Sequence, residues 1–171
     1  MPLFVEGGKA AAAPKASQAK LPFVMFGEGQ AESPYIPSGW IGKADAISMQ
    51  EDWSENPQAG NTCMRLQFKS PSNFGGIIWQ SPANDWGDKP GGLNLTGATK
   101  LTFWARGEVG NEKVDFAMGV IKKDKKFPDS ANADLKGIVL TKEWQQYTID
   151  LEGKDLSSVK TCLLYTSDAA D

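Results

Sequence analysis

The stretch of residues 95–108, in which apolar and polar side chains alternate from Lys100 to Arg106, constrains the fold more than any other feature of the sequence. Leu101, Phe103 and Ala105 recur at every second position, so an extended chain places all three on one face. Glycines flank the alternating residues on both sides, as turns require. The pattern predicts a β-strand with one face in a core, and we expect it to be a central strand of a β-sandwich.

Several further segments are predicted to be short strands, and the sequence between them is typical of loops. Glycine, proline, asparagine and charged residues fill the longest intervening stretches, at residues 51–60, 81–92 and 122–135. These features predict an all-β fold, an antiparallel β-sandwich of the jelly-roll type. The predicted strands cover residues 21–26, 35–42, 46–49, 64–69, 75–80, 113–121, 137–141 and 144–151, and a last strand begins at Val159.

The composition removes several classes of function. The 171 residues contain no histidine, which excludes a Ser-His-Asp triad and most catalytic zinc sites, although enzymes that use carboxylates alone remain open. A net charge of −3 gives no indication of nucleic-acid binding. No apolar run approaches the about 20 residues that cross a bilayer. We therefore predict no nucleic-acid partner and no membrane partner, and the two cysteines predict no thiolate metal site.

The two ends of the chain differ in composition from its body. Residues 1–20 are rich in alanine, lysine, glycine and proline and lack the pattern of a signal peptide, so we expect a disordered linker or the remnant of a leader. Residues 162–171 resemble the translation of a DNA adapter used in preparing sequencing libraries, and such non-native tails are excluded from fold reasoning. We expect one β-sandwich domain over residues 21–161, cut short before its last strand.

Two of the six tryptophans stand where no core is expected. Trp86 lies in a polar loop beside Asp88, and Trp104 occupies the outward face of its strand beside Arg106. A flat aromatic ring with polar neighbours suits the stacking of a sugar ring and hydrogen bonds to its hydroxyl groups. The alternative is that these polar groups only solvate a sheet face. The predicted carbohydrate-binding residues are Trp86, Trp104, Arg65, Asp88, Arg106 and Asp115.

Other residues carry weaker signals. Trp40 lies among prolines and Trp144 opens an inward-facing strand, so we expect both rings to pack in the interior. Paired carboxylates are what a glycoside-cleaving enzyme needs, but no spacing singles out a pair among the loops. The loop carboxylates considered are Asp85, Asp88, Asp129 and Asp134.

Five segments together resemble the bacterial galactose-binding-like jelly-roll domains, a group that includes several families of carbohydrate-binding modules. These segments are residues 37–42, 84–87, 95–107, 128–130 and 140–151, and they span most of the predicted domain. The resemblance implies a fold first of all, because one fold hosts many functions. It also implies a structural calcium ion between the first and last strands, for which Glu28 is the candidate ligand from the first strand.

The resemblance and the aromatic residues together predict a non-catalytic carbohydrate-binding module for a plant-type or bacterial polysaccharide. Such a module belongs to a secreted or cell-surface protein of a polymer-degrading bacterium, next to other domains of the same protein. Two alternatives remain open. One is a structural module that packs on a neighbouring domain without a sugar ligand, and the other is a small glycan-active enzyme that uses loop carboxylates. No cofactor is expected besides the calcium ion.

Overall fold

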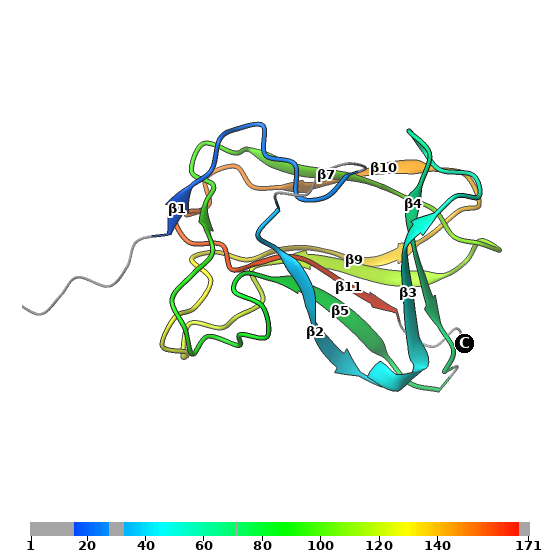
Figure 1. Cartoon of the computed structure of the whole chain (residues 1–171), viewed down its shortest axis with the longest axis horizontal. Helices are drawn as coiled ribbons and strands as arrows, with labels where there is room; N and C mark the ends of the chain where they lie inside the picture. The colour runs from blue at the N-terminus through cyan, green and yellow to red at the C-terminus, as the bar shows by residue number, and fades with distance from the viewer. Residues whose placement is uncertain (1–15, 28–32, 71, 168–171) are drawn as a thin grey trace, which may run out of the picture.

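The computed structural model describes residues 16–27, 33–70 and 72–167, and these ranges form an all-β structure (Figure 1). Apart from one turn of 3-10 helix, η1 at Ala44–Ala46, the regular elements in these ranges are strands. In the same ranges no helix is long and apolar enough to span a bilayer. The strands are β1 Ser17–Gln18, β2 Ile36–Gly42, β3 Ile47–Trp53, β4 Cys63–Phe68, β5 Gly75–Gln80, β6 Leu93–Asn94, β7 Lys100–Ala105, β8 Lys113–Met118, β9 Ala133–Val139, β10 Gln145–Asp150 and β11 Thr161–Ser167.

The strands pack as a β-sandwich, which confirms the predicted fold class. One layer is a five-stranded antiparallel sheet with the order β2-β5-β11-β8-β9. The antiparallel pairs β7–β10 and β3–β4 pack on the apolar face of this sheet, at the top and at the right of Figure 1. The short parallel pair β1–β6 lies at the opposite end from β3 and β4.

The core lies between these layers and is built from the inward positions of each strand. On β8, Val114, Phe116 and Met118 are buried, as their alternation predicts. The Phe103 ring of β7 lies 4.5 Å from the Phe116 ring, centroid to centroid, and 5.9 Å from the Tyr147 ring of β10. The contact between Phe103 and Phe116 joins the two layers, and burial of such large apolar rings is a major source of stability.

Three predictions about the arrangement of the strands are wrong. β7 is not central, because its one partner among the described strands is β10. Residues 21–26 form no strand, and the chain pairs instead a few residues earlier, at β1. The predicted loops at residues 51–60 and 122–135 are shorter, because β3 continues to Trp53 and β9 begins at Ala133. Alternation reports which face of a strand is buried, but it does not report which strand lies beside it.

A strand occupies the place that the predicted truncation leaves open. β11 lies between β5 and β8 in the five-stranded sheet, with Cys162 and Leu163 buried. Its register with both neighbours shifts just before residue 164. Leu163 has a φ of 81°, in the left-handed region that side chains other than glycine rarely adopt. The origin of residues 162–171 in an adapter stays a prediction.

Candidate functional site

A buried ion pair joins three loops at one end of the sandwich. Lys160 is 1% exposed, and its ammonium group donates to the carboxylate of Asp85, which is 3% exposed. The same ammonium group donates to the backbone carbonyls of Lys89, at 2.6 Å, and of Phe127, at 3.2 Å. Its three protons therefore all have acceptors. These contacts tie together the β5–β6 loop, the β8–β9 loop and the segment that leads into β11.

The Asp85 carboxylate also fixes the backbone of its own loop. It accepts the N–H groups of Gly87, Asp88 and Lys89 at 3.3, 3.0 and 3.0 Å. Burial by itself would raise the pKa of Asp85, but the hydrogen bonds from Lys160 and from the backbone of Asp88 and Lys89 lower it below its ordinary value. The carboxylate is therefore ionised near neutral pH, and a charged acceptor with several donors holds this turn in one shape.

The side chain of Trp86 projects from this turn. Its neighbours Asp85 and Gly87 are buried, whereas Trp86 itself is 40% exposed. Gly87 has a φ of 101°, and a β-carbon there would lie 2.6 Å from the Cβ of Lys125, so the position requires glycine. The carbonyl of Gly87 accepts the N–H of Phe127 at 2.9 Å, which anchors the turn on the β8–β9 loop. The loop thus presents a large aromatic ring to solvent from a fixed backbone.

A pocket of about 310 Å³ opens beside this turn, between the β5–β6 loop, the β8–β9 loop and the segment that leads into β11. Figure 1 shows these two loops, in green and yellow, side by side at the end of the molecule away from β3 and β4. The volume is at the lower end of the about 300–1,000 Å³ of small-molecule sites, so the pocket suits one small ring rather than a long chain.

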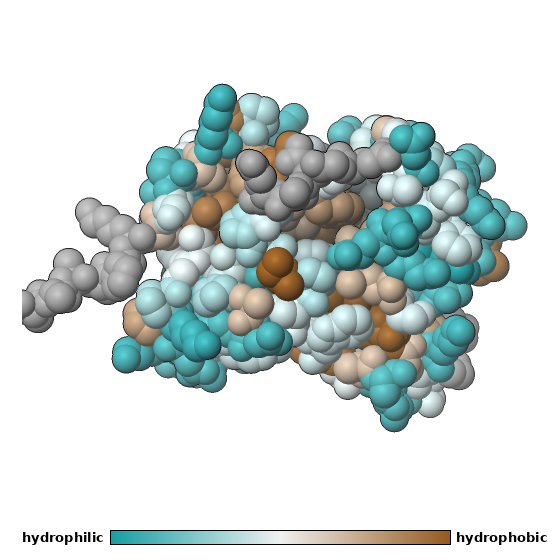
Figure 2. Space-filling model, in the orientation of Figure 1, coloured by the Kyte–Doolittle hydropathy of each residue, from teal (hydrophilic) through white to brown (hydrophobic). Residues whose placement is uncertain are grey.

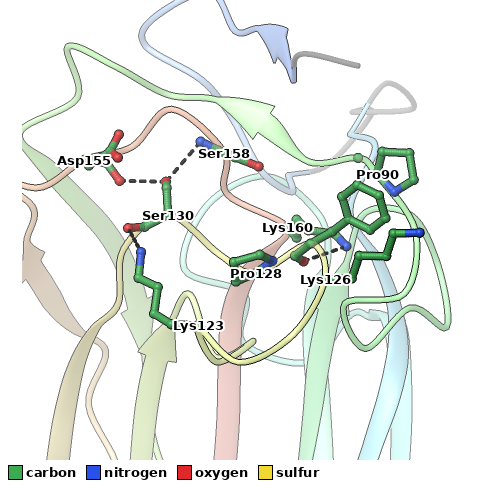
Figure 3. Close-up of a pocket in the computed structure, with 10 residues that line it drawn as sticks. Pro90, Lys123, Lys126, Pro128, Ser130, Asp155, Ser158 and Lys160 are labelled. Atoms are coloured by element: carbon green, nitrogen blue, oxygen red, sulfur yellow. Dashed lines mark hydrogen bonds between the residues drawn. The ribbon is translucent and has the colours of Figure 1, made fainter. Parts of the chain in front are cut away.

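The two sides of the pocket differ in chemistry. Figure 3 shows Lys126 and Pro90 on one side and Lys123, Ser130 and Asp155 on the other, with Lys160 between them. On the second side, the Ser130 hydroxyl donates to the backbone carbonyl of Asp155 at 2.7 Å, and the Lys123 ammonium donates to the backbone carbonyl of Ser130 at 2.5 Å. That side is therefore held by hydrogen bonds, whereas the Lys126 ammonium lies 5.3 Å from the centre of the Phe127 ring.

Two lysines of one charge run, Lys123 and Lys126, line the pocket, and the sequence did not predict this role. Residues 122–126 read Lys-Lys-Asp-Lys-Lys, and all five side chains are exposed. In the part of the chain that the structure describes, no ion pair within 4 Å joins any of these four lysines to a carboxylate. The signal was present as a charge run inside a predicted loop. Such a run is usually only a solvated surface, and here the fold places it at the mouth of a pocket.

The contacts divide the six predicted carbohydrate-binding residues among separate parts of the fold. Trp86 and Asp88 lie together in the turn described above, and Asp88 is exposed. Trp104 is 45% exposed on β7, where it faces Gln146 of β10 across the ladder. Asp115 lies on β8, and its carboxylate accepts the N–H of Gly137 at 2.7 Å.

The two predicted arginines contact aromatic rings near β4 and the end of β7. The Arg106 guanidinium lies 5.5 Å from the Trp144 ring centre. The Arg65 guanidinium lies 4.3 Å from the Trp53 ring centre and donates to both carboxylate oxygens of Glu108 at 3.2 Å. Both guanidinium groups have partners within the chain, and the ion pair of Arg65 with Glu108 links β4 to the segment after β7.

The two tryptophans predicted to pack in the interior differ from each other. Trp40 is 39% exposed on the edge strand β2, so the prediction that it is an interior residue is wrong. Trp144 is partly buried, and its indole N–H donates to the carbonyl of Asn56 at 3.0 Å. The proline-rich context of Trp40 indicated a rigid segment, but a segment at a sheet edge has one side open to solvent.

Two of the four loop carboxylates considered for catalysis, Asp85 and Asp129, are buried and hold the structure. Asp129 is buried and accepts the N–H groups of Ile121, Lys160 and Thr161, at 2.9, 2.6 and 3.1 Å. Asp85 is engaged in the ion pair with Lys160. Asp134 lies within β9 rather than in a loop.

The predicted calcium ligand, Glu28, lies outside the described residues. Among those residues, no three side chains of histidine, cysteine, aspartate or glutamate gather as a metal site would require. The calcium ion that the resemblance implies stays a prediction.

No protein-family model matches the chain, and no curated protein matches it. The class of protein is therefore defined by its fold and its site alone. It is a β-sandwich that presents an exposed aromatic ring and a lysine-bordered pocket at one end of its two layers.

Proposed function

We propose that the chain is a non-catalytic carbohydrate-binding module that binds a polysaccharide through its exposed tryptophans. The observation that carries this proposal is the exposure of Trp86 on a turn held by the buried Asp85–Lys160 pair. The parent protein is secreted or lies on the cell surface, where the module keeps neighbouring domains close to their polymer.

A fixed turn favours binding because little conformational freedom is lost when the ligand arrives. An exposed tryptophan has only two side-chain torsions, and its backbone here is already held by charged hydrogen bonds. Its ring offers a flat apolar surface of the size of a pyranose face. The exposed Asp88 belongs to the same turn, and Gly87 of this turn accepts the N–H of Phe127, which lines the pocket. These features support stacking of one sugar ring on Trp86.

Trp104 is a second stacking residue of the proposed module. It is exposed on the outward face of β7, next to Gln146 and Thr102, whose polar groups can bond hydroxyl groups. Its strand lies on the opposite layer from the five-stranded sheet, away from the loops that carry Trp86 (Figure 1). The two tryptophans therefore contact different units of a polymer, or different chains.

Two alanine variants and a matched control test this proposal. Trp86→Ala and Trp104→Ala remove the proposed stacking rings, and Trp40→Ala removes a ring of similar exposure from β2. Binding to a panel of soluble polysaccharides is measured by calorimetry. We expect Trp86→Ala to weaken binding by about 30-fold, since a central tryptophan in an interface contributes about 2 kcal/mol or more.

The control should bind as the unchanged protein does, and all three variants should melt cooperatively. If Trp86→Ala and Trp104→Ala both bind with unchanged affinity, the site assignment is wrong. If a cooperatively melting, unchanged protein binds no polysaccharide of the panel, the proposed function itself is wrong.

A further inference from the structure

We infer that the saccharide bound beside Trp86 is acidic, and that its carboxylate or sulfate group is held at the lysine-bordered pocket. The inference rests on the proposed function and names the ligand class for the same site. Both anionic groups share the chemistry that matters here, because each offers several oxygen atoms to ammonium donors.

Positive charge is concentrated beside the pocket. The chain as a whole has a net charge of −3, yet residues 122–126 hold four lysines against one aspartate. The buried pair Asp85–Lys160 is neutral in sum, and the other charged residues that line the pocket are Lys123 and Lys126 against Asp155. A concave site in which positive charge predominates concentrates anionic ligands.

The three lysines that line the pocket differ in how many ammonium protons they have free for a ligand. Lys160 donates its three ammonium protons to Asp85 and to two backbone carbonyls, so no proton is left for a ligand. Lys123 donates one ammonium proton to the carbonyl of Ser130, and its other two protons are available to a ligand. The Lys126 ammonium lies near the Phe127 ring and donates no hydrogen bond to any residue that the structure describes. Lys126 and Lys123 are therefore the donors available to an anion.

The two sides of the pocket are not equally suited to an anionic group. Asp155 lies on the same side as Lys123 and Ser130, whereas Lys126 lies beside Pro90 on the other side (Figure 3). A second carboxylate close to Asp155 would be repelled, so the anionic group is expected on the side of Lys126. Gly87, which follows Trp86, accepts the N–H of Phe127 at 2.9 Å, and Phe127 lines the pocket next to Lys126. We therefore expect a ring that stacks on Trp86 to direct its acidic substituent towards Lys126. The Asp155 side then accepts sugar hydroxyl groups.

The test compares polymers that differ in charge alone. Polygalacturonate carries carboxylates, its fully methyl-esterified form is the neutral counterpart, and carrageenan carries sulfate esters. Affinity is measured by calorimetry at about 0.02 M and about 0.3 M salt, because exposed charges are screened at the higher value. We expect the acidic polymers to bind, the esterified polymer to bind at least about tenfold more weakly, and salt to weaken only the acidic ones.

Matched charge variants locate the effect. Two variants remove the proposed donors. The first is Lys126→Gln, which breaks no hydrogen bond among the described residues, and the second is the double variant Lys123→Gln/Lys126→Gln. Lys43→Gln removes one exposed lysine after the far end of β2. We expect about a threefold loss of affinity for polygalacturonate in the single variant, about tenfold in the double variant, and no change in the control. A stronger effect of the variants on carrageenan identifies the group as sulfate, and a stronger effect on polygalacturonate identifies it as carboxylate.

The outcomes separate this inference from the proposed function. If the esterified polymer binds as tightly as polygalacturonate and both lysine variants bind normally, while Trp86→Ala abolishes binding, the module stands and the acidic ligand is refuted. If single-stranded DNA competes as well as polygalacturonate, the surface takes any polyanion and the saccharide class is refuted. If none of the polymers binds, both proposals fail.

Discussion

Replacing Lys160 with methionine tests whether the buried ion pair organises the loop end of the sandwich. Methionine is of similar length and carries no charge, so Lys160→Met preserves most of the packing. It leaves the Asp85 carboxylate and the carbonyls of Lys89 and Phe127 without their shared donor. Breaking a buried pair by removing one partner costs about 3–5 kcal/mol, because the remaining charge stays buried and uncompensated. We expect the free energy of unfolding to fall by that amount.

The double variant Asp85→Asn/Lys160→Met separates the charge from the packing. The backbone N–H groups of Asp88 and Lys89 both reach one carboxylate oxygen of Asp85, Oδ1, and an amide oxygen in its place can still accept them. The buried charge is then gone. We expect the double variant to be more stable than Lys160→Met alone, with a coupling energy of about 1–3 kcal/mol between the two positions.

Urea unfolding followed by tryptophan fluorescence measures these differences. The midpoint should shift while the slope of free energy against urea stays constant, because the extent of the fold is unchanged. Lys136→Met is the control, since Lys136 is exposed on β9 and its ammonium lies 3.7 Å from the carboxylate of Asp134. Its midpoint should not move. A loss below about 1 kcal/mol in Lys160→Met would refute the claim that this pair is a stabilising link between the loops.

The remaining predictions concern acid, the turn glycine and the cysteines. The pKa of Asp85 is lower in the folded chain than its ordinary value of 3.8. The contribution of Asp85 to stability is therefore full above pH 3.8 and is lost as the pH falls through the folded pKa. Asp85→Asn should flatten this acid dependence of stability, measured by urea titrations. Gly87→Ala should lower the free energy of unfolding more than Gly153→Ala. Gly153 has a φ of 72°, where a side chain costs about 1–2 kcal/mol, and a β-carbon there meets no steric contact, whereas Gly87 has a φ of 101° and a β-carbon there would lie 2.6 Å from Lys125. Equal losses would contradict the close approach at Gly87. Burial raises the pKa of Cys162 to about 12, so a thiol reagent at mildly alkaline pH should modify at most Cys63 in the native protein and both thiols in urea.

The strands that alternate were predictable because local sequence decides which face is buried. β5 was predicted with its observed bounds, and the inward faces of β8 and β10 were predicted correctly from Phe116 and Ile149. The order of the strands was not predictable, because pairing partners are selected by packing between residues far apart in the chain. The prediction for residues 21–26 failed for the same reason, because an apolar run forms a strand only where another strand pairs with it.

The site was predictable only where one residue type and its neighbours carry the signal. The exposure of Trp86 followed from its polar loop. The role of Asp85 did not, because its partner Lys160 is 75 residues away and nothing near Lys160 in the sequence indicates a buried charge. Residues 122–126 were visible as a charge run, but their place at a pocket depends on how the β5–β6 and β8–β9 loops meet.

The position of β11 determines when the larger sheet can be completed. Its residues leave the ribosome after those of every other described strand, yet they lie between β5 and β8. Until they arrive, β2–β5 and β8–β9 are two separate ladders that expose unpaired N–H and C=O groups along one edge each. Contacts between residues so distant in sequence form slowly. We therefore expect the nascent chain to carry two open strand edges, on β5 and on β8, until β11 inserts between them and joins the two ladders into one sheet.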